Sequence, residues 1–188
     1  LYMVNDMAEK QPNTRFEESG GGLYKIKGGI GHSDWSADGM QPHLADKMLE
    51  YLDENKDSDK PFFLYMALTA PHIPLFPSKE FKGKSKIGDY GDLVMMIDDI
   101  VGRVNRKLKE IGKYDNTIVM FAADNGCAGY INMDRINRKG HYPSYIYRGY
   151  KSHGWEGGHR IPFILSWGDR YGHVTDNSLV SLTDLYAT

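Results

Sequence analysis

Three short segments of the sequence concentrate side chains that could do chemistry. They are TAPHIPLFP at 69–77, DNGCAGY at 124–130 and YRGYKSHGWEGGHR at 147–160. In the first segment, Pro71 and Pro74 flank His72, and prolines so placed favour extended backbone that presents the imidazole from a stiff loop. Such a histidine could hydrogen-bond a leaving group or donate a proton to it. The alternative is an imidazole that only satisfies loop carbonyls.

In the second segment, Asp124, Asn125 and Gly126 follow an apolar run. An Asn-Gly pair is a strong hairpin signal, which gives one interpretation. Asp and Asn also offer oxygen ligands, which suit calcium or magnesium rather than zinc. Because calcium takes about six to eight ligands, two oxygens cannot fill its shell. Most ligands of any metal bound here would therefore come from other residues.

Cys127 is the only cysteine of the chain. A reactive thiolate needs a basic partner or a helix N-terminus beside it, and none can be placed there from the sequence. We therefore expect Cys127 to be a small buried hydrophobe. A single cysteine also excludes an internal disulfide framework and a cysteine-rich zinc module.

The third segment places Lys151 in a loop with Arg148 and His153. A lysine there could clamp an anion as a compact point charge, and Arg148 could add a forked donor. A solvated lysine in an exposed loop is the alternative. We expect Trp155 to pack against the loop, and Glu156 to hold backbone amides ahead of the glycine pair rather than to transfer protons.

The elements that must position these segments follow from hydrophobic periodicity. The pattern predicts helices over 41–56 and 91–111, and strands at 61–68, 116–124 and 161–167. Because the strands are apolar on both faces and alternate with helices, we expect an α/β fold with a largely parallel central sheet flanked by helices. Reactive groups of such folds gather in the loops at the carboxyl ends of the strands. The first two segments follow predicted strands, and the third leads into one.

Composition places the chain among ordinary globular domains. It has 188 residues, of which 40% are hydrophobic and 26% charged, and a formal net charge of -2 gives no reason to expect nucleic acid as a partner. No apolar run reaches about 18 residues, so no transmembrane segment is expected. Residues 1–40 are glycine-rich, and we expect an irregular excursion with one short strand at 23–26. The chain opens with Leu1, which suggests an excerpt or a processed product.

Four blocks of the chain resemble, in the same order, blocks of the type I sulfatases of the alkaline phosphatase superfamily. They are ALTAPHIP at 67–74, MIDDIVGRVNRKLKEIGKYDNTIVMFAADNG at 96–126, YRGYKSHGWEGGHRIPFILSW at 147–167 and SLTDLYAT at 181–188. The most specific feature is K-x-x-x-W-E-G-G-x-R-I-P downstream of a strand that ends in DNG. The resemblance covers 41–188, with at best weak similarity over 1–40. It implies an alkaline-phosphatase-like fold and one incomplete sulfatase catalytic domain over 1–188, with 41–188 as its core.

The resemblance assigns roles residue by residue. It implies that Asp124 and Asn125 are calcium ligands, that Lys151 binds the sulfate oxygens, and that His72 lies at the sulfate ester near its leaving oxygen. Lys151 and His72 are thus the expected catalytic and substrate-binding residues. Arg148 aligns with an arginine just ahead of the family's lysine, and Arg148 and His153 are further substrate-binding candidates. The tyrosine-rich GHYPSYIYRGYK could stack on a sugar or pack the loop.

The family's nucleophile is a formylglycine, made from the first residue of a C-x-P-x-R or S-x-P-x-R motif. Neither motif occurs here, and AGYI follows Cys127. The family's early aspartate pair and its lysine-histidine block are not recognisable either. We therefore expect the nucleophile to lie outside this chain, and the 188 residues alone to hydrolyse no sulfate ester.

The leading hypothesis is a calcium-dependent sulfatase that hydrolyses aryl or carbohydrate sulfate esters, with a sulfated small molecule or glycan as partner. One alternative is a phosphoryl or phosphonate ester hydrolase or transferase of the same superfamily. Another is a non-catalytic relative that binds sulfated glycans. The upstream nucleophile separates the three. Calcium use fits an exported protein, periplasmic or extracellular, or a lysosomal one, because free calcium is scarce in the cytosol.

Overall fold

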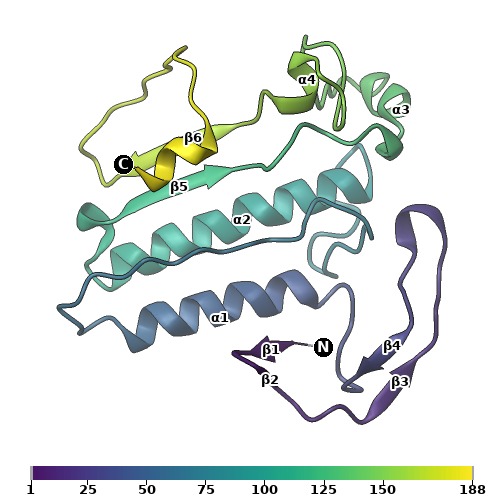
Figure 1. The fold of residues 1–188 in the computed structure, drawn as a ribbon, viewed down its shortest axis with the longest axis horizontal. Coiled ribbons are helices and arrows are strands. Elements are labelled where there is room, and N and C mark those ends of the chain that lie inside the picture. Colours follow the sequence, from purple (N-terminus) through teal and green to yellow (C-terminus); the bar gives the residue numbers. More distant parts are fainter. Residues whose placement is uncertain (1, 188) are drawn as a thin grey trace.

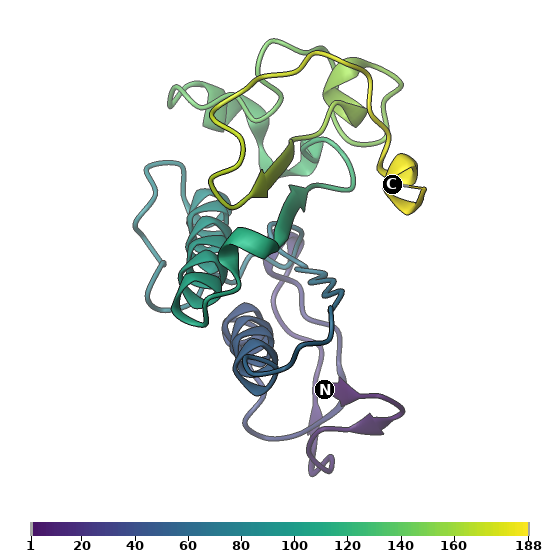
Figure 2. The ribbon, with the colours of Figure 1, turned by 90° about the vertical axis from the view of Figure 1, so that its left-hand side faces the viewer.

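The computed structural model describes residues 2–187. Two long helices, α1 (Met40–Glu54) and α2 (Asp89–Glu110), lie side by side in the middle of the molecule (Figure 1). On one side of this pair lie the short strands β1 (Met3–Val4), β2 (Met7–Ala8), β3 (Thr14–Phe16) and β4 (Gly29–Gly31). On the other side lie β5 (Ile118–Ala122), β6 (Phe163–Trp167) and the short helices α3 (Met133–Asn137) and α4 (Glu156–His159) (Figure 2).

Both predicted helices are confirmed, with ends that differ from the prediction by two residues or fewer. Helix α2 carries acidic residues in its first turn and lysines in its last turn, as the helix dipole favours. Gly112 follows it with φ at 68°, and the Lys113 N–H donates to Leu108 O at 2.9 Å, so a glycine cap ends the helix. No helix in the described range combines the length and the apolar character needed to cross a membrane.

The core forms where the two helices meet the loop that joins them. Its buried members are Ala45, Leu75, Phe81, Leu93, Met96 and Ile100. Helix α1 contributes Ala45 and α2 contributes the last three, so the apolar stripe of each helix faces this cluster. Arg103 and Asp46 add an exposed ion pair of 2.6 Å between the helices.

The strand predicted at 61–68 is not formed. This segment is extended and alternates between exposed and half-buried residues, with Phe63 90% and Tyr65 79% exposed. No strand among residues 2–187 pairs with it. A strand exists only through ladder hydrogen bonds to a neighbour, and an apolar run by itself does not supply that neighbour.

The strands predicted at 116–124 and 161–167 are confirmed as β5 and β6, but they pair antiparallel, with Met120 opposite Leu165. Each pair of strands within residues 2–187 is antiparallel, which corrects the expectation of a largely parallel sheet for this part of the chain. The expectation of burial on both faces is also wrong here, because Met120 and Leu165 are exposed. The two strands are joined by residues 123–162, so DNG is no hairpin turn between them.

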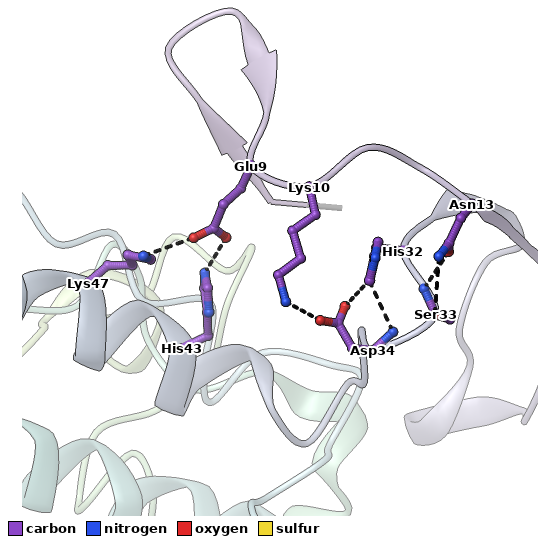
Figure 3. A network of polar contacts seen from close by, with 8 residues as sticks. All are labelled: Glu9, Lys10, Asn13, His32, Ser33, Asp34, His43 and Lys47. Atoms are coloured by element: carbon purple, nitrogen blue, oxygen red, sulfur yellow. Dashed lines mark hydrogen bonds and ion pairs between the residues drawn. The ribbon is translucent and has the colours of Figure 1, made fainter.

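Residues 2–40 are more ordered than predicted. They form the antiparallel pairs β1–β2 and β3–β4, and the strand expected at 23–26 is replaced by a single 3-10 turn at Gly22–Tyr24. Polar contacts attach this part to α1 (Figure 3). Glu9 accepts from His43 Nε2 and Lys47 Nζ, both at 2.9 Å. Asp34 in turn pairs with Lys10 and His32.

Candidate active site

Two of the three chemical segments are joined through their backbones. The Gly126 N–H donates to Gly158 O at 2.9 Å, and the Lys151 N–H donates to Cys127 O at 2.8 Å. The contact leaves no room for a side chain, because a Cβ on Gly126 would lie 1.9 Å from Gly157 O. The loop that follows β5 and the loop that carries Lys151 therefore occupy fixed positions relative to each other.

Positive charge in the Lys151 loop is left uncompensated. Within the described residues the Lys151 ammonium makes no hydrogen bond and no ion pair. The Arg148 guanidinium lies over the Trp155 ring, 4.0 Å from its centroid, and the His153 ring lies 4.0 Å from that of Tyr150. No carboxylate pairs with Lys151 or Arg148 in the described range, so the loop attracts an anion.

One of two expectations for this loop needs correction. The Glu156 carboxylate does not hold backbone amides: it accepts from Arg160 at 2.7 Å and lies 3.7 Å from His159. A nearby arginine is the stronger partner for a carboxylate. The expectation for Trp155 is confirmed: its ring packs against the loop through Arg148, although 51% of the residue stays exposed.

His72 has one ring nitrogen engaged and one vacant. Its Nδ1 lies 2.9 Å from Ile73 O, and because a carbonyl oxygen only accepts, the hydrogen of the neutral ring sits on Nδ1. Nε2 has no partner within residues 2–187. The imidazole satisfies a loop carbonyl, as one interpretation expected, and still keeps a nitrogen for chemistry. The loop is a turn rather than extended backbone, since the His72 N–H donates to Thr69 O at 3.1 Å.

Tyr130 links the His72 loop to the DNG segment, and the sequence analysis missed it. Its ring meets the His72 ring edge to face at 5.9 Å, and the Ile73 backbone donates a hydrogen bond to its hydroxyl. Burial raises the pKa of Tyr130, so it remains a neutral phenol at neutral pH. Nothing in the sequence distinguishes this tyrosine from the other twelve, since only the fold brings it to His72.

Residues 124–130 thus contact the His72 loop through Tyr130 and the Lys151 loop through Cys127. Figure 1 shows the ends of the extended segment and of β5, the first turn of α2, and α4 at the same end of the molecule. The three segments singled out in the sequence are therefore brought together in space.

Asp124 and Asn125 have the donor chemistry of a partial calcium site. The Asp124 carboxylate is exposed and makes no ion pair in the described range, and Asn125 donates through Nδ2 to Gly126 O at 3.1 Å, which leaves Oδ1 to accept. Both vacant groups are hard oxygen donors, which fit calcium. In residues 2–187 no cluster of three or more His, Cys, Asp or Glu side chains could hold a metal ion.

Cys127 is half-buried, and its Sγ lies 3.6 Å from the Tyr90 hydroxyl. Burial raises the pKa of the Cys127 thiol and also raises the pKa of Tyr90. The thiol therefore stays protonated at neutral pH, in agreement with a structural role.

Comparison with known proteins decides the family. The model of the family described as Sulfatase matches residues 5–188. This chain belongs to the sulfatase family. The match begins well before residue 41, so the resemblance extends further toward the N-terminus than the sequence motifs indicated.

Relatives of this sulfatase chain act on different sulfate esters according to their names. The chain is 33% identical over 157 residues to an N-acetylgalactosamine-6-O-sulfatase of Bacteroides thetaiotaomicron, and the match covers 82% of this chain and 30% of that protein. It is 35% identical over 150 residues to an arylsulfatase of Hemicentrotus pulcherrimus, covering 80% of this chain and 26% of that protein. The chain therefore spans less than a third of the length of these relatives.

A solved structure shares the fold of the sulfatase chain. It is a Bacteroides thetaiotaomicron sulfatase described in the context of glycosaminoglycan metabolism, superposed with a TM-score of 0.68 at 34% identity over 76% of this chain and 30% of that chain. The prediction of an alkaline-phosphatase-like α/β fold is thereby confirmed.

Proposed function

We propose that this chain forms part of a calcium-dependent sulfatase that hydrolyses sulfate esters of a small molecule or a glycan. Residues 1–188 contribute one incomplete catalytic domain, in which 41–188 is the core and 1–40 a glycine-rich excursion of the same domain. The formylglycine nucleophile is supplied from outside these residues, because neither C-x-P-x-R nor S-x-P-x-R occurs in the sequence. Calcium use supports an exported or lysosomal location.

The proposal is carried by the unpaired functional groups around residues 124–130. The Lys151 ammonium has no counterion among the described residues, and it would neutralise negative charge on the sulfonyl oxygens. His72 Nε2 is vacant, and in the protonated ring it would donate to the oxygen of the departing alcohol. Arg148 and His153 lie in the same loop and would contact the anionic substrate.

Asp124 and Asn125 would hold calcium through their vacant oxygens, together with ligands from outside this chain. When bound, the ion would stabilise negative charge on the sulfate group. The isolated 188 residues would bind a sulfate ester without hydrolysing it, because they lack the nucleophile.

Mass spectrometry of the full-length protein tests the nucleophile. A peptide map should contain a C-x-P-x-R or S-x-P-x-R peptide in its formylglycine form. The same preparation should release sulfate from a sulfated monosaccharide or from 4-nitrophenyl sulfate. Turnover of phosphate or phosphonate esters in place of sulfate esters would indicate the alternative chemistry, and absence of the motif together with glycan binding would indicate a non-catalytic relative.

A variant tests the role of Lys151. Lys151→Met should lower kcat/KM for sulfate esters by about 100-fold or more, because a preorganised charge at the developing anion is lost. Lys82→Met, which removes an exposed lysine ahead of α2, is the matched control and should retain full activity. Equal activity of the two variants would remove Lys151 from the site.

A further inference from the structure

A cavity of about 230 Å³ opens beside His72, between the first turn of α1 and the loop that follows residue 68. Most of its wall is apolar and includes Met40 and Phe76, and three polar side chains complete it: Gln41, Thr69 and His72. A mainly apolar pocket with a few convergent polar groups is the usual form of a small-molecule site. An alcohol that leaves from a sulfate ester held at His72 would occupy this space.

Gln41 has an unused hydrogen-bonding group in the wall of this cavity. The side chain is only 3% exposed. Its Nε2 donates to Thr69 Oγ1, whereas Oε1 is covered and has no partner within the described residues. A buried acceptor without a donor destabilises the protein, so such a group calls for an explanation. A ligand whose hydrogen-bond donor reaches Oε1 from the cavity would explain why this acceptor has no partner in the protein.

We propose that Gln41 is a specificity-determining residue whose Oε1 accepts a hydrogen bond from a hydroxyl or amide N–H of a sugar sulfate. This inference rests on the proposed sulfatase function. A site with a buried acceptor discriminates strongly against substrates that lack the matching donor, because the acceptor would remain unpaired. Simple aryl and steryl sulfates offer no donor beside the ester, whereas a sugar ring offers several.

The size of the cavity supports the same substrate class. Its volume of about 230 Å³ lies below the roughly 300–1,000 Å³ of pockets that hold drug-sized ligands. It suits one ring rather than a fused ring system. The size therefore favours a substrate that places a single ring in the cavity over a steryl ring system, and the Gln41 acceptor favours a sugar ring.

Access to Oε1 requires a neighbouring side chain to move, because the atom is covered. Met40 lines the cavity, and its sulfur lies 4.0 Å from Thr69 Oγ1, the group that Gln41 Nε2 contacts. An unbranched methionine has several accessible rotamers and adapts readily to a ligand. Its displacement would open a path from the cavity to the Gln41 amide.

The test compares two substrates on the full-length protein. Gln41→Leu should lower kcat/KM for a sulfated monosaccharide by about 10- to 100-fold, as loss of a buried hydrogen bond predicts. Hydrolysis of 4-nitrophenyl sulfate should change by less than about threefold, because this substrate never used the acceptor. Asn105→Leu is the matched control: Asn105 Oδ1 is also covered and unpartnered, but Asn105 does not line the cavity.

A substrate series gives a second readout that does not depend on the variant folding well. On the unchanged protein, replacing one particular sugar hydroxyl by hydrogen, or N-methylating the amide, should reproduce the 10- to 100-fold loss. The proposal would be overturned if Gln41→Leu lost kcat/KM equally on the sulfated monosaccharide and on 4-nitrophenyl sulfate. It would also be overturned if removing any of the sugar's donors left the kcat/KM of the unchanged protein the same. If the unchanged protein hydrolyses neither substrate, the proposed function fails. Calorimetry then compares binding of the sulfated sugar to the unchanged protein and to Gln41→Leu, and this comparison still decides the role of Gln41.

Discussion

The rings of Tyr130 and His72 meet edge to face, with centroids 5.9 Å apart. Edge-to-face contact fixes the plane of the imidazole, while the bond from Nδ1 to Ile73 O fixes its rotation. Nε2 is therefore presented in one direction by two independent contacts. Tyr130 belongs to the segment that begins at Asp124, so the position of the expected acid is tied to that of the expected metal ligands.

The first prediction concerns removal of this ring contact. Tyr130→Leu should lower kcat for sulfate ester hydrolysis by about 10-fold with little change in KM, because the imidazole loses its orientation but the anion site remains. Tyr130→Phe keeps the ring contact and should lose much less. Steady-state kinetics on the full-length protein measures both, and a large rise in KM in Tyr130→Leu would show that the tyrosine acts on binding instead.

Calcium binding should depend on the Asp124 carboxylate. Adding calcium to the full-length protein should raise its thermal midpoint, because a ligand that binds only the folded state stabilises it. Asp124→Ala should abolish that rise, whereas Asp59→Ala, which removes an exposed carboxylate far along the chain, should preserve it. Differential scanning fluorimetry with calcium and with a chelator gives the comparison. A calcium-dependent rise that survives in Asp124→Ala would place the ion elsewhere.

Asp92 should be a major contributor to stability. Its side chain is fully buried and accepts from the Gly83 N–H at 2.7 Å and the Ser85 N–H at 2.6 Å, which holds the loop ahead of α2. Asp92→Asn turns one acceptor into a donor that faces an N–H, and we expect a loss of about 2 kcal/mol in the free energy of unfolding. Urea denaturation monitored by circular dichroism checks this. Asp98→Asn, an exposed change on the same helix, should cost almost nothing.

The network around Glu9 predicts loss of stability in acid. The hydrogen bond from Lys47, with help from His43, lowers the pKa of Glu9 below its usual 4.5. A carboxylate with a lowered pKa in the folded state stabilises the protein fully above its ordinary pKa, and this contribution disappears as pH falls through the folded value. The thermal midpoint should therefore drop between about pH 5 and pH 3, and Glu9→Gln should reduce the drop. Glu80→Gln, the control, should leave the pH profile unchanged.

The helices were predictable because their signals are local. The apolar stripe through Leu93, Ile97 and Leu108 and the glycine at 112 define α2 without reference to the rest of the fold. Strand pairing is not local: the run at 61–68 has strand composition but no partner, and the orientation of β5 against β6 is set by the forty residues that join them.

The candidate site likewise contains some residues that sequence patterns reveal and others that only the fold reveals. His72, Asp124, Asn125 and Lys151 stand out because they follow strand patterns or occupy a specific motif. Tyr130 and Gln41 matter only through tertiary contacts, with His72 in one case and with a cavity wall in the other. The prediction for Glu156 is wrong because Arg160, four residues later, binds its carboxylate.

The extended segment 61–68 also has a consequence for handling the protein. Its backbone amides and carbonyls are unpaired along most of its length, and two aromatic rings project from it into water. An open edge of this kind accepts a strand from another molecule as readily as one from its own chain. We therefore expect residues 61–68 to promote aggregation by intermolecular strand pairing at high protein concentration unless another segment covers this edge.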